Sequence, residues 1–407
     1  MIGGASASPL LCTSKTWEPR NTRKVSGDRM KITGYRVERF VADRGRPTGD
    51  ANDPDGQRGA STGSLLFVET DAGITGIVPG GTTDALFRVV EGEDPRGVAG
   101  LWKKLNNHVF KGSGYRSISS LDIALWDIKA KANGEPLWRT FGALEGRVKA
   151  YASGLDMPLT DDELADFYTT LADLGIDGGK LKVGLDQKAD LRRLGIMRDC
   201  LAKVKDDPYL MIDANEFWSP KQAIQKVSEM EEQFDLFWVE EPARRWDYNG
   251  LRQVSRGVKA AVATGENLHH IGDYMSLIGK DAVDIVQFGS GGCAGFTGAI
   301  YLAGMAHGFE KPVSVIGGPG HLAAHVAASV PNHNMMEVKD LETPKAWSTS
   351  TRIEDGWIVL GEEPGLGITV HDEHLGVPDG FASTRGTAPR RDGAALYDNP
   401  PDRPVGT

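Results

Sequence analysis

The length, composition and charge of the chain exclude several broad classes of protein. Its 407 residues exceed one ordinary domain but fit a barrel with a smaller second domain, and 40% hydrophobic with 25% charged residues is typical of a soluble globular protein. The net charge of −10 argues against a nucleic-acid partner. No apolar run approaches the length of a membrane span, and the N-terminus lacks the apolar core of a signal peptide.

The cysteines indicate a reducing compartment. Cys12, Cys200 and Cys293 are odd in number and far apart, without a Cys-x-x-Cys pair. This pattern predicts neither a disulfide framework nor a zinc site. We expect a cytoplasmic homo-oligomer whose partner is a small molecule, with neither nucleic acid nor a membrane among its partners.

The first part of the chain alternates between polar segments and short regular elements. Residues 1–29 are rich in Ser, Gly and Arg without periodicity, which predicts a mobile tail. Residues 32–41 and 64–69 have the pattern of strands. Between them, residues 43–63 are rich in Gly, Asp, Arg and Pro, so we expect either a loop that closes as a lid over the active site or plain disorder. Residues 84–142 then have the pattern of helices.

From residue 148 onward, strand-like and helix-like segments alternate. Such alternation predicts a parallel sheet with helices between its strands, and eight repeats predict a (β/α)₈-type barrel. The eight predicted strands are residues 149–153, 179–183, 209–213, 236–240, 261–265, 283–288, 312–316 and 335–338.

Three carboxylates follow consecutive predicted strands at almost equal intervals. Asp213 ends the apolar run that begins at Tyr209, Glu240 ends the next run, and Glu266 ends the one after it. In such a barrel the active site lies at the C-terminal ends of the strands, so the three side chains converge. Carboxylates so close together need a cation to neutralise them, and a set of ligands made only of oxygen atoms suits Mg²⁺. The alternative is three separately solvated side chains.

Two lysines are placed to act as a base beside these carboxylates. Lys180 and Lys182 are two residues apart on the second predicted strand, so both point toward the same face. Neighbouring ammonium groups and burial lower the pKa of a lysine, which allows it to act as a general base near neutral pH. The alternative is a pair of surface lysines on an exposed strand.

Several short motifs occur in a fixed order and spacing between about residues 31 and 376. In the predicted barrel they are Lys180-Leu-Lys182, Asp213-Ala-Asn215, Trp238-Val-Glu-Glu-Pro242 and Gly265-Glu-Asn267, and before it Thr70-Asp-Ala-Gly-Ile-Thr-Gly76 and the helix of residues 120–130. Through these motifs the chain resembles the mandelate racemase/muconate lactonizing enzyme group of the enolase superfamily, and within it the acid-sugar dehydratases.

The resemblance implies a role for each charged residue. Asp213, Glu240 and Glu266 would bind Mg²⁺, which would hold the substrate carboxylate and stabilise the enediolate formed when the α-proton leaves. Lys182 would be the catalytic base. Lys180 would lower the pKa of Lys182 and contact the substrate carboxylate.

Two further residues are implied to bind the substrate. Asn215 belongs to the motif that carries Asp213. Glu337, at the end of the eighth predicted strand, matches an acid that in the family holds the substrate carboxylate from the far side, for which it must be protonated or share a proton. A strand-end glutamate without a role in binding is the alternative.

The chain departs from the family at the second acid/base site. Family members that have one usually carry Asp at the end of the sixth strand and His at the end of the seventh. Here those positions are Gly289 and Gly317, and Gly291 and Gly292 occupy the region where another branch of the superfamily places a second lysine. His321, in a loop rich in Gly and Pro, is a candidate substitute acid, and His269 and His270, just past Glu266, are other candidates.

The sequence therefore predicts a (β/α)₈-type barrel with an α+β N-terminal capping domain. The expected division is a capping domain at 31–147 completed by about 351–376, a barrel at 148–350, and a C-terminal tail at 377–407. The expected function is an Mg²⁺-dependent hydro-lyase acting on a small carboxylate substrate, a sugar acid, in which Lys182 removes the α-proton and a β-hydroxide leaves. The alternatives are an epimerase, racemase or cycloisomerase that uses the same enolate, and a barrel that binds a ligand without catalysis.

Overall fold

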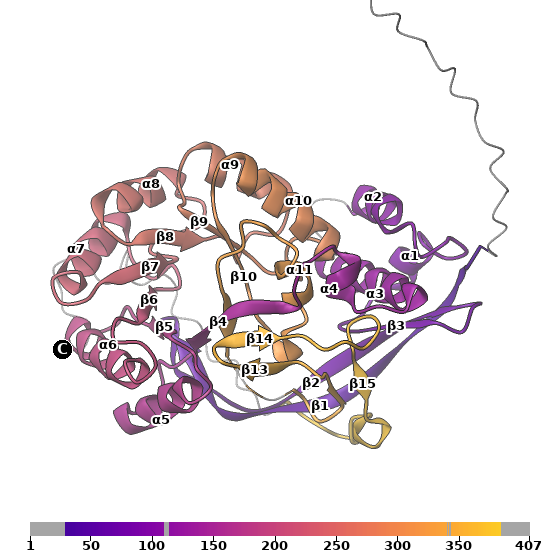
Figure 1. Ribbon diagram of the computed structural model, residues 1–407, viewed down its shortest axis with the longest axis horizontal. Helices are drawn as coiled ribbons and strands as arrows, with labels where there is room; N and C mark the ends of the chain where they lie inside the picture. The colour runs from indigo at the N-terminus through magenta and orange to yellow at the C-terminus, as the bar shows by residue number, and fades with distance from the viewer. Residues whose placement is uncertain (1–28, 110–113, 340, 342, 384–407) are drawn as a thin grey trace, which may run out of the picture.

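The computed structural model describes residues 29–109, 114–339, 341 and 343–383. The predicted tails at 1–29 and 377–407 lie largely outside these residues. Within the described part, a barrel surrounded by helices lies beside a smaller unit of three strands and several helices (Figure 1).

Eight parallel strands form the barrel, as predicted. Strands β4 to β10 pair in chain order, β11 pairs with β4, and a bridge between Val313 and His333 closes the gap between β10 and the segment before β11. All eight overlap the segments predicted from the sequence. The strands are β4 Arg147–Ser153, β5 Gly178–Lys182, β6 Tyr209–Asp213, β7 Leu236–Glu240, β8 Ala261–Thr264, β9 Ile285–Phe288, β10 Val313–Val315 and β11 Met336–Val338.

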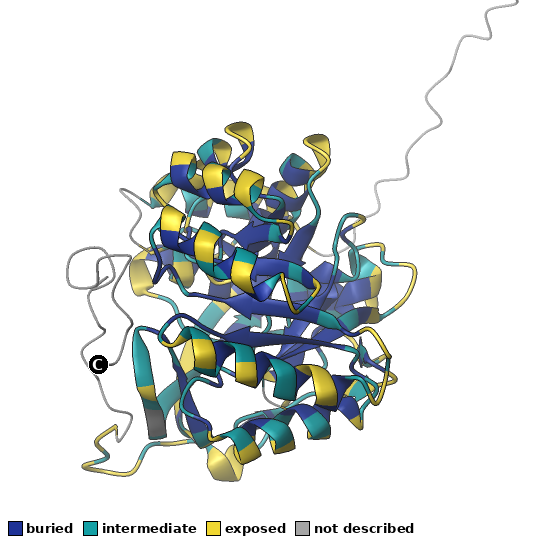
Figure 2. Cartoon of the chain, turned by 90° about the vertical axis from the view of Figure 1, so that its left-hand side faces the viewer, coloured by how far each residue is buried: buried dark blue, intermediate teal, exposed yellow. Residues whose placement is uncertain are grey.

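Helices cover the outside of the barrel. Local signals in the sequence start several of them: Thr160 and Glu163 form a capping box at α5, and Ser219 and Gln222 form one at α7. Figure 2 shows the resulting layers, with buried strands inside and exposed residues on the outer faces of the helices. The helices are α5 Asp161–Ala172, α6 Gln187–Leu201, α7 Pro220–Met230, α8 Tyr248–Gly257, α9 Ile271–Gly279, α10 Gly295–Gly308, η1 Pro319–His321 and α11 Ala324–Ala327.

The inside of the barrel has an apolar layer beneath a charged layer. Because side chains alternate along a strand, a residue two positions further on points to the same side. Asp213, Glu240 and Glu337 each follow a buried apolar residue by two positions, and they lie above it near the C-terminal strand ends. The apolar layer consists of Tyr151, Met211, Trp238, Ala263, Ile285 and Met335.

The smaller unit has the secondary structure predicted for the capping domain. It is an antiparallel three-stranded sheet with helices packed against it. It joins the barrel through α3, where Asp122 accepts hydrogen bonds from the backbone N–H of Thr297 (2.9 Å) and from its hydroxyl (2.6 Å). Its elements are β1 Ile32–Asp50, β2 Asp53–Thr70, β3 Thr75–Pro79, α1 Asp84–Phe87, α2 Val98–His108, α3 Tyr115–Asn133 and α4 Leu137–Thr140.

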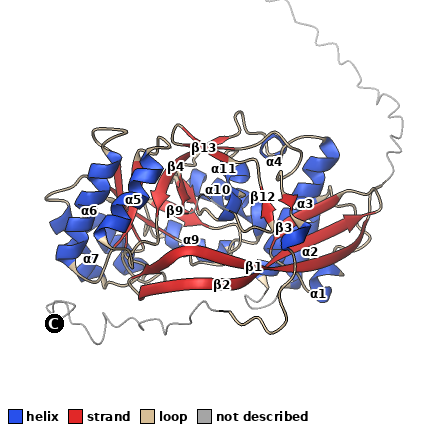
Figure 3. Ribbon diagram, turned by 90° about the horizontal axis from the view of Figure 1, so that it is seen from below, coloured by secondary structure: helices blue, strands red, loops and turns tan. Residues whose placement is uncertain are grey.

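Residues 43–63 are not the loop that we expected. They belong to β1 and β2, which pair as one long antiparallel hairpin from Ile32 opposite Thr70 to Asp50 opposite Asp53. Register shifts in β1 between Arg44 and Asp50 accommodate irregular residues, and cross-strand bonds satisfy the backbone, so the Gly- and Asp-rich composition does not prevent strand formation. Figure 3 shows this hairpin running from the helices of the cap to the barrel.

The chain returns to both units after the barrel. The hairpin of β13 Arg352–Glu354 and β14 Trp357–Val359 adds antiparallel to β4, while β12 Trp347–Ser348 pairs with β15 Thr369–Val370 ahead of η2 Asp372–His374. Cys200 and Cys293 are buried free thiols, and Cys12 lies outside the described residues. No helix in the described part of the chain is both long and apolar enough to cross a bilayer.

Asp127 of α3 ties three segments together, so we predict that it is essential for stability. Its buried carboxylate accepts hydrogen bonds from the backbone N–H groups of Ile77 (2.9 Å) and Leu366 (2.7 Å) and from the ammonium of Lys131 (2.7 Å). Asp127→Ala leaves two buried donors unpaired and should lower the free energy of unfolding by about 2–4 kcal/mol in urea denaturation. Asp173→Ala, at an exposed position, should change it by less than about 0.5 kcal/mol; equal effects would contradict this role.

Candidate active site

The parallel register brings the predicted charged residues to one level of the barrel. Lys182 lies opposite Asp213, and Asp213 lies opposite Glu240, on three adjacent strands. Lys180 lies one step deeper, opposite Met211. All four charged side chains are buried, and Lys180 is only 1% exposed. A charge so far from water requires partners of opposite sign.

Lys182 is held by two acceptors from the strand beside it. Its Nζ donates hydrogen bonds to Asp213 Oδ2 and to Asn215 Oδ1, the second at 2.9 Å. The backbone N–H of Lys182 donates to Asp156 Oδ1 at 3.0 Å, which fixes the end of β5. The tip of this lysine therefore has a defined position before any substrate binds.

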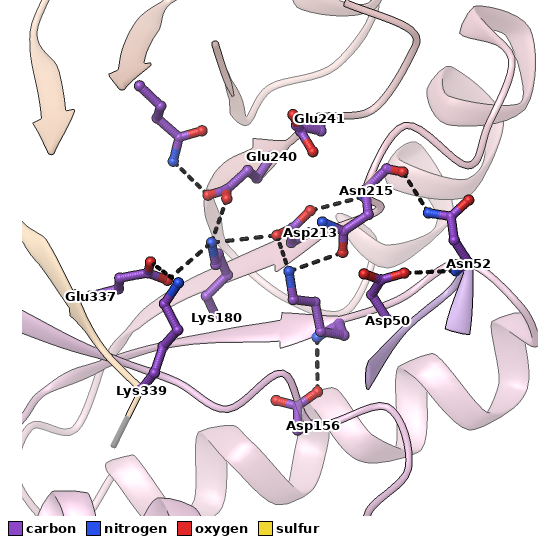
Figure 4. A network of polar contacts seen from close by, with 12 residues as sticks. Asp50, Asn52, Asp156, Lys180, Asp213, Asn215, Glu240, Glu241, Glu337 and Lys339 are labelled. Atoms are coloured by element: carbon purple, nitrogen blue, oxygen red, sulfur yellow. Dashed lines mark hydrogen bonds and ion pairs between the residues drawn. The ribbon is translucent and has the colours of Figure 1, made fainter. Parts of the chain in front are cut away.

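Lys180 bridges carboxylates from three different strands. Its Nζ contacts Glu240 Oε1 and lies 3.4 Å from Asp213 Oδ2 and 3.8 Å from Glu337 Oε2. Figure 4 shows its ammonium between Glu240, Asp213 and Glu337. One lysine thus links β6, β7 and β11 across the barrel mouth.

The pKa values of the two lysines differ from our expectation. Burial lowers the pKa of Lys182, and Lys180 lowers it further as predicted, but the contact with Asp213 outweighs both and raises it. The pKa of Lys180 is raised well above its ordinary value, because Glu240 and other neighbours outweigh burial. The net effect on both lysines is therefore a raised pKa rather than the lowered one that we expected, although the influence of Lys180 on Lys182 has the expected direction.

The pKa values of the carboxylates shift in opposite directions. Burial raises the pKa of Asp213, but Lys182 and Lys180 outweigh burial and lower it to about 2. Burial raises the pKa of Glu240 to about 8, with Asp213 and Glu266 adding to the rise and Lys180 opposing it. The pKa of Glu266 is also raised, by burial and by Asp213. Crowded negative charge of this kind is relieved by a cation.

Asp213, Glu240 and Glu266 all lie at the barrel mouth, but they do not form a finished metal site. In the part of the chain that the structure describes, no three His, Cys, Asp or Glu side chains are placed to hold a metal ion together. The ammonium of Lys180 lies against Asp213 and Glu240 instead. The donor set itself, three carboxylates, fits a hard divalent cation such as Mg²⁺.

Glu337 has a partner that the sequence analysis missed. Lys339, two residues further along, places its Nζ 2.6 Å from Glu337 Oε1. Burial raises the pKa of Glu337, but Lys339 and Lys180 outweigh burial and lower it. Without a substrate, its two lysine neighbours therefore favour the charged form of Glu337. The spacing of Glu337 and Lys339 on one strand end was the signal that could have indicated the pair.

A polar cavity of about 230 Å³ lies above these groups. Figure 4 shows Glu337 and Lys339 on one side of Asp213, and Asp50 and Asn52 of the β1–β2 hairpin tip on the other. The tip is attached to the barrel, because Gly49 N–H donates to Leu155 O (2.8 Å) and the Asn52 amide donates to Asn215 O (2.9 Å). Residues lining the cavity that the sequence analysis did not predict as site residues are Asp50, Asn52, Leu155, Glu216, Glu241, Arg244, Arg245, Asn267 and Lys339.

The backbone around this cavity is strained. Asn215, Glu216 and Glu241 have φ angles of 46°, 59° and 43°, in the left-handed region that non-glycine residues seldom occupy. Such conformations cost about 1–3 kcal/mol each and persist where surrounding contacts hold them. Arg245 supplies such contacts, with Nε 2.7 Å from Glu216 Oε1 and Nη2 2.9 Å from Glu216 Oε2, and Asn267 donates to Glu241 Oε1 at 2.7 Å.

The structure does not bring His321 to this cavity. His321 is buried at the end of η1 with a φ of 51°, and it is absent from the residues that line the polar cavity. His270, another candidate acid, caps α9 by accepting from Gly272 N–H, and His269 is exposed. Gly289 and Gly317 line a separate, largely apolar cavity of about 870 Å³. The positions of the usual dyad therefore carry no proton donor or acceptor side chain.

Comparison with known proteins agrees with this geometry. Residues 163–374 match the family described as enolase C-terminal domain-like, which is more than half of the chain, and residues 57–142 match the N-terminal domain of mandelate racemase and muconate lactonizing enzyme. The chain belongs to the enolase superfamily. Within it, the N-terminal match places the chain in the mandelate racemase/muconate lactonizing enzyme group.

Relatives within the superfamily have different activities. The chain is 34% identical to the L-talarate/galactarate dehydratase of Salmonella typhimurium, over 69% of this chain and 71% of that protein. It is 31% identical to the 3,6-anhydro-alpha-L-galactonate cycloisomerase of Streptomyces coelicolor, over 68% and 75%. The crystal structure of a Streptomyces coelicolor racemase with bound magnesium superposes with a TM-score of 0.75 at 25% identity, covering 84% of this chain and 98% of that one.

Gly289 and Gly317 should respond differently to substitution. A Cβ on Gly317 would lie 2.3 Å from the backbone oxygen of Glu337 and 3.0 Å from its Cγ, whereas the nearest atom to a Cβ on Gly289 is 3.8 Å away. We predict that Gly317→Ala lowers the thermal midpoint and impairs catalysis by displacing Glu337, with a cost of about 1–3 kcal/mol. Gly289→Ala should leave the midpoint nearly unchanged, and similar losses in both variants would contradict the packing described.

Proposed function

We propose that the protein removes the α-proton of a sugar acid and eliminates water from the neighbouring carbon, as an acid-sugar dehydratase. The observation that carries the proposal is the buried pair Lys180 and Lys182 beside three carboxylates, facing strand ends that carry Gly289 and Gly317 in place of a second acid/base group. The similarity to an L-talarate/galactarate dehydratase supports it.

Asp213, Glu240 and Glu266 are the residues that would hold Mg²⁺. Their oxygens suit a hard cation. The pKa values of Glu240 and Glu266 are raised by burial and by neighbouring carboxylates, because the two lysines do not fully neutralise the cluster. When bound, Mg²⁺ supplies a Lewis acid that stabilises negative charge on the substrate carboxylate as the α-proton leaves.

Lys182 acts as the base. Once Asp213 has another cation as partner, the attraction that raises the pKa of Lys182 is reduced, while burial and Lys180 still lower that pKa. Asn215 remains a hydrogen-bond partner and orients the Nζ atom. Lys180 lies deeper in the mouth, where its ammonium binds the substrate carboxylate, and Glu337 contacts that carboxylate from the far side once it takes up or shares a proton.

An elimination needs fewer groups than a racemisation. Racemisation requires bases on both faces of the planar intermediate, whereas elimination requires one base and an acid that protonates the departing hydroxide. Lys182, once protonated, supplies that proton on the same face, which gives syn elimination. His321 is the alternative acid, acting from the opposite face. A cycloisomerase is the second candidate, which the similarity to the Streptomyces coelicolor cycloisomerase favours.

The proposal includes a cytoplasmic location and a homo-oligomeric assembly. The location is supported by the buried, unpaired Cys200 and Cys293. Self-association is supported by large apolar side chains exposed on α9 and α10, namely Met275, Tyr301 and Phe309.

We predict that Lys182→Ala removes both α-proton exchange and product formation. Without the base, exchange of the α-proton in D₂O should fall by at least about 10²-fold, measured by NMR on a panel of acid sugars with Mg²⁺. Exchange that persists at the wild-type rate would show that another group removes the proton. Wild-type protein that interconverts C2 epimers without losing water would identify an epimerase, and no exchange with any acid would indicate a binding protein.

In the same assay, the variant His321→Asn identifies the group that protonates the departing hydroxide. We expect exchange and water loss to persist, because His321 lies outside the lining of the polar cavity, and asparagine tolerates the positive φ of this position. If exchange persists while water loss slows by about 10²–10⁴-fold, His321 is the general acid and the elimination is anti.

We predict that Glu240→Gln abolishes turnover by weakening Mg²⁺ binding. Removal of one of three anionic ligands should raise the Kd for Mg²⁺, measured by calorimetry, and EDTA should reversibly inactivate the wild type. Glu232→Gln, which removes an exposed carboxylate before β7, is the matched control and should bind Mg²⁺ as the wild type does. Full activity after exhaustive chelation would disprove the metal assignment.

A further inference from the structure

One cation of the polar cavity has no anionic partner. Five described lysines and arginines line this cavity, and four of them form ion pairs: Lys180 with Glu240, Lys182 with Asp213, Arg245 with Glu216, and Lys339 with Glu337. The side chain of Arg244 makes no hydrogen bond or ion pair with any described residue, and only its backbone carbonyl is bonded, to the N–H of Asp247 at 2.9 Å. Its guanidinium lies 5.9 Å from the ring of Trp246, a side chain that is 67% exposed.

The loop that carries Arg244 is held in place. Arg244 lies between β7 and α8, four residues after Glu240. The next residue, Arg245, is fixed by Glu216 through its backbone N–H (3.1 Å) and its side chain, and its Nη1 donates to Asn267 O at 3.0 Å. A fixed loop with a partly buried cation at the cavity wall is a preorganised site for an anion.

The cavity itself limits the ligand to a small and polar molecule. Its volume of about 230 Å³ is below the ~300–1,000 Å³ of pockets that enclose drug-sized ligands. Leu155 is the one apolar side chain among the described residues that line it. Asn52, Asn215 and Asn267 offer amide groups that can donate to and accept from hydroxyls.

We propose that the substrate is a sugar acid with a carboxylate at each end, and that Arg244 binds the carboxylate remote from the reacting carbon. The first carboxylate is already assigned to Lys180 and Glu337, so Arg244 is left for a second anion. A guanidinium matches a carboxylate because it offers two parallel hydrogen bonds. The inference rests on the proposed function and specifies its substrate class.

Direct binding tests this inference without turnover. In a Lys182→Ala background with Mg²⁺, calorimetry measures the Kd of two dicarboxylates, galactarate and D-glucarate, and of their monocarboxylate counterparts, galactonate and D-gluconate. We expect at least one dicarboxylate to bind about 10- to 100-fold more tightly than its counterpart, the range for hydrogen bonds to a charged group. Arg244→Gln should remove this difference by weakening dicarboxylate binding alone, and Arg244→Lys should retain part of it.

Arg256→Gln is the matched control, since Arg256 lies exposed on α8 and does not line the cavity. It should retain the full preference. With Lys182 present, Arg244→Gln should raise KM for the dicarboxylate much more than it lowers kcat. Three results would overturn the inference: no preference for dicarboxylates, an equal loss for both classes in Arg244→Gln, or no binding of any of the four acids.

The inference and the proposed function fail in different ways. Dicarboxylate binding that depends on Arg244, without α-proton exchange in the enzyme that retains Lys182, would disprove the proposed chemistry and leave the subsite in place. Efficient dehydration of monocarboxylates at a rate that Arg244→Gln leaves unchanged would disprove the subsite and leave the proposed chemistry in place.

Discussion

The buried layer of opposite charges at the barrel mouth is the constraint on which the rest of the structure depends. Lys180 and Lys182 lie against Asp213 and Glu240, above an apolar layer that excludes water. Removing one partner of such a buried pair is costly, about 3–5 kcal/mol, because the remaining charge is left unpaired. The parallel register that places Lys182 opposite Asp213, and Asp213 opposite Glu240, is therefore a structural requirement, and it is the geometry on which the proposed chemistry rests.

Elements far from the barrel strands complete this layer. The tip of the β1–β2 hairpin closes one side of the cavity with Asp50 and Asn52, and it is attached to the loop after β4 through Gly49. Asp156, in that same loop, accepts from the backbone of Lys182 and from the hydroxyl of Tyr168. The loop to which the hairpin tip is attached thus also holds the backbone of Lys182 in place.

The one-sided chemistry of the site is built into its packing. At Gly317 the space that a side chain would occupy is already filled by the backbone of Glu337, so β10 approaches β11 closely. At Gly289 there is room for a side chain, yet the neighbouring cavity is largely apolar. The described titratable side chains that line the polar cavity consequently come from β5, from β11 and the loop after it, from the loops after β6, β7 and β8, and from the hairpin tip, and none comes from β9 or β10.

The sequence by itself determined the eight strands, the inward position of Lys180 and Lys182, and the carboxylates at successive strand ends, because alternation and strand length are local properties of the chain. It did not reveal the hairpin of residues 43–63, whose pairing depends on a partner strand rather than on its own composition. Nor did it indicate the raised pKa values of the lysines or the role of Lys339, since these depend on distances between side chains on different strands. Only the tertiary structure decided which charges are paired, and so left Arg244 without an anionic partner among the described residues, because electrostatic energies depend on separation and burial that no local pattern records.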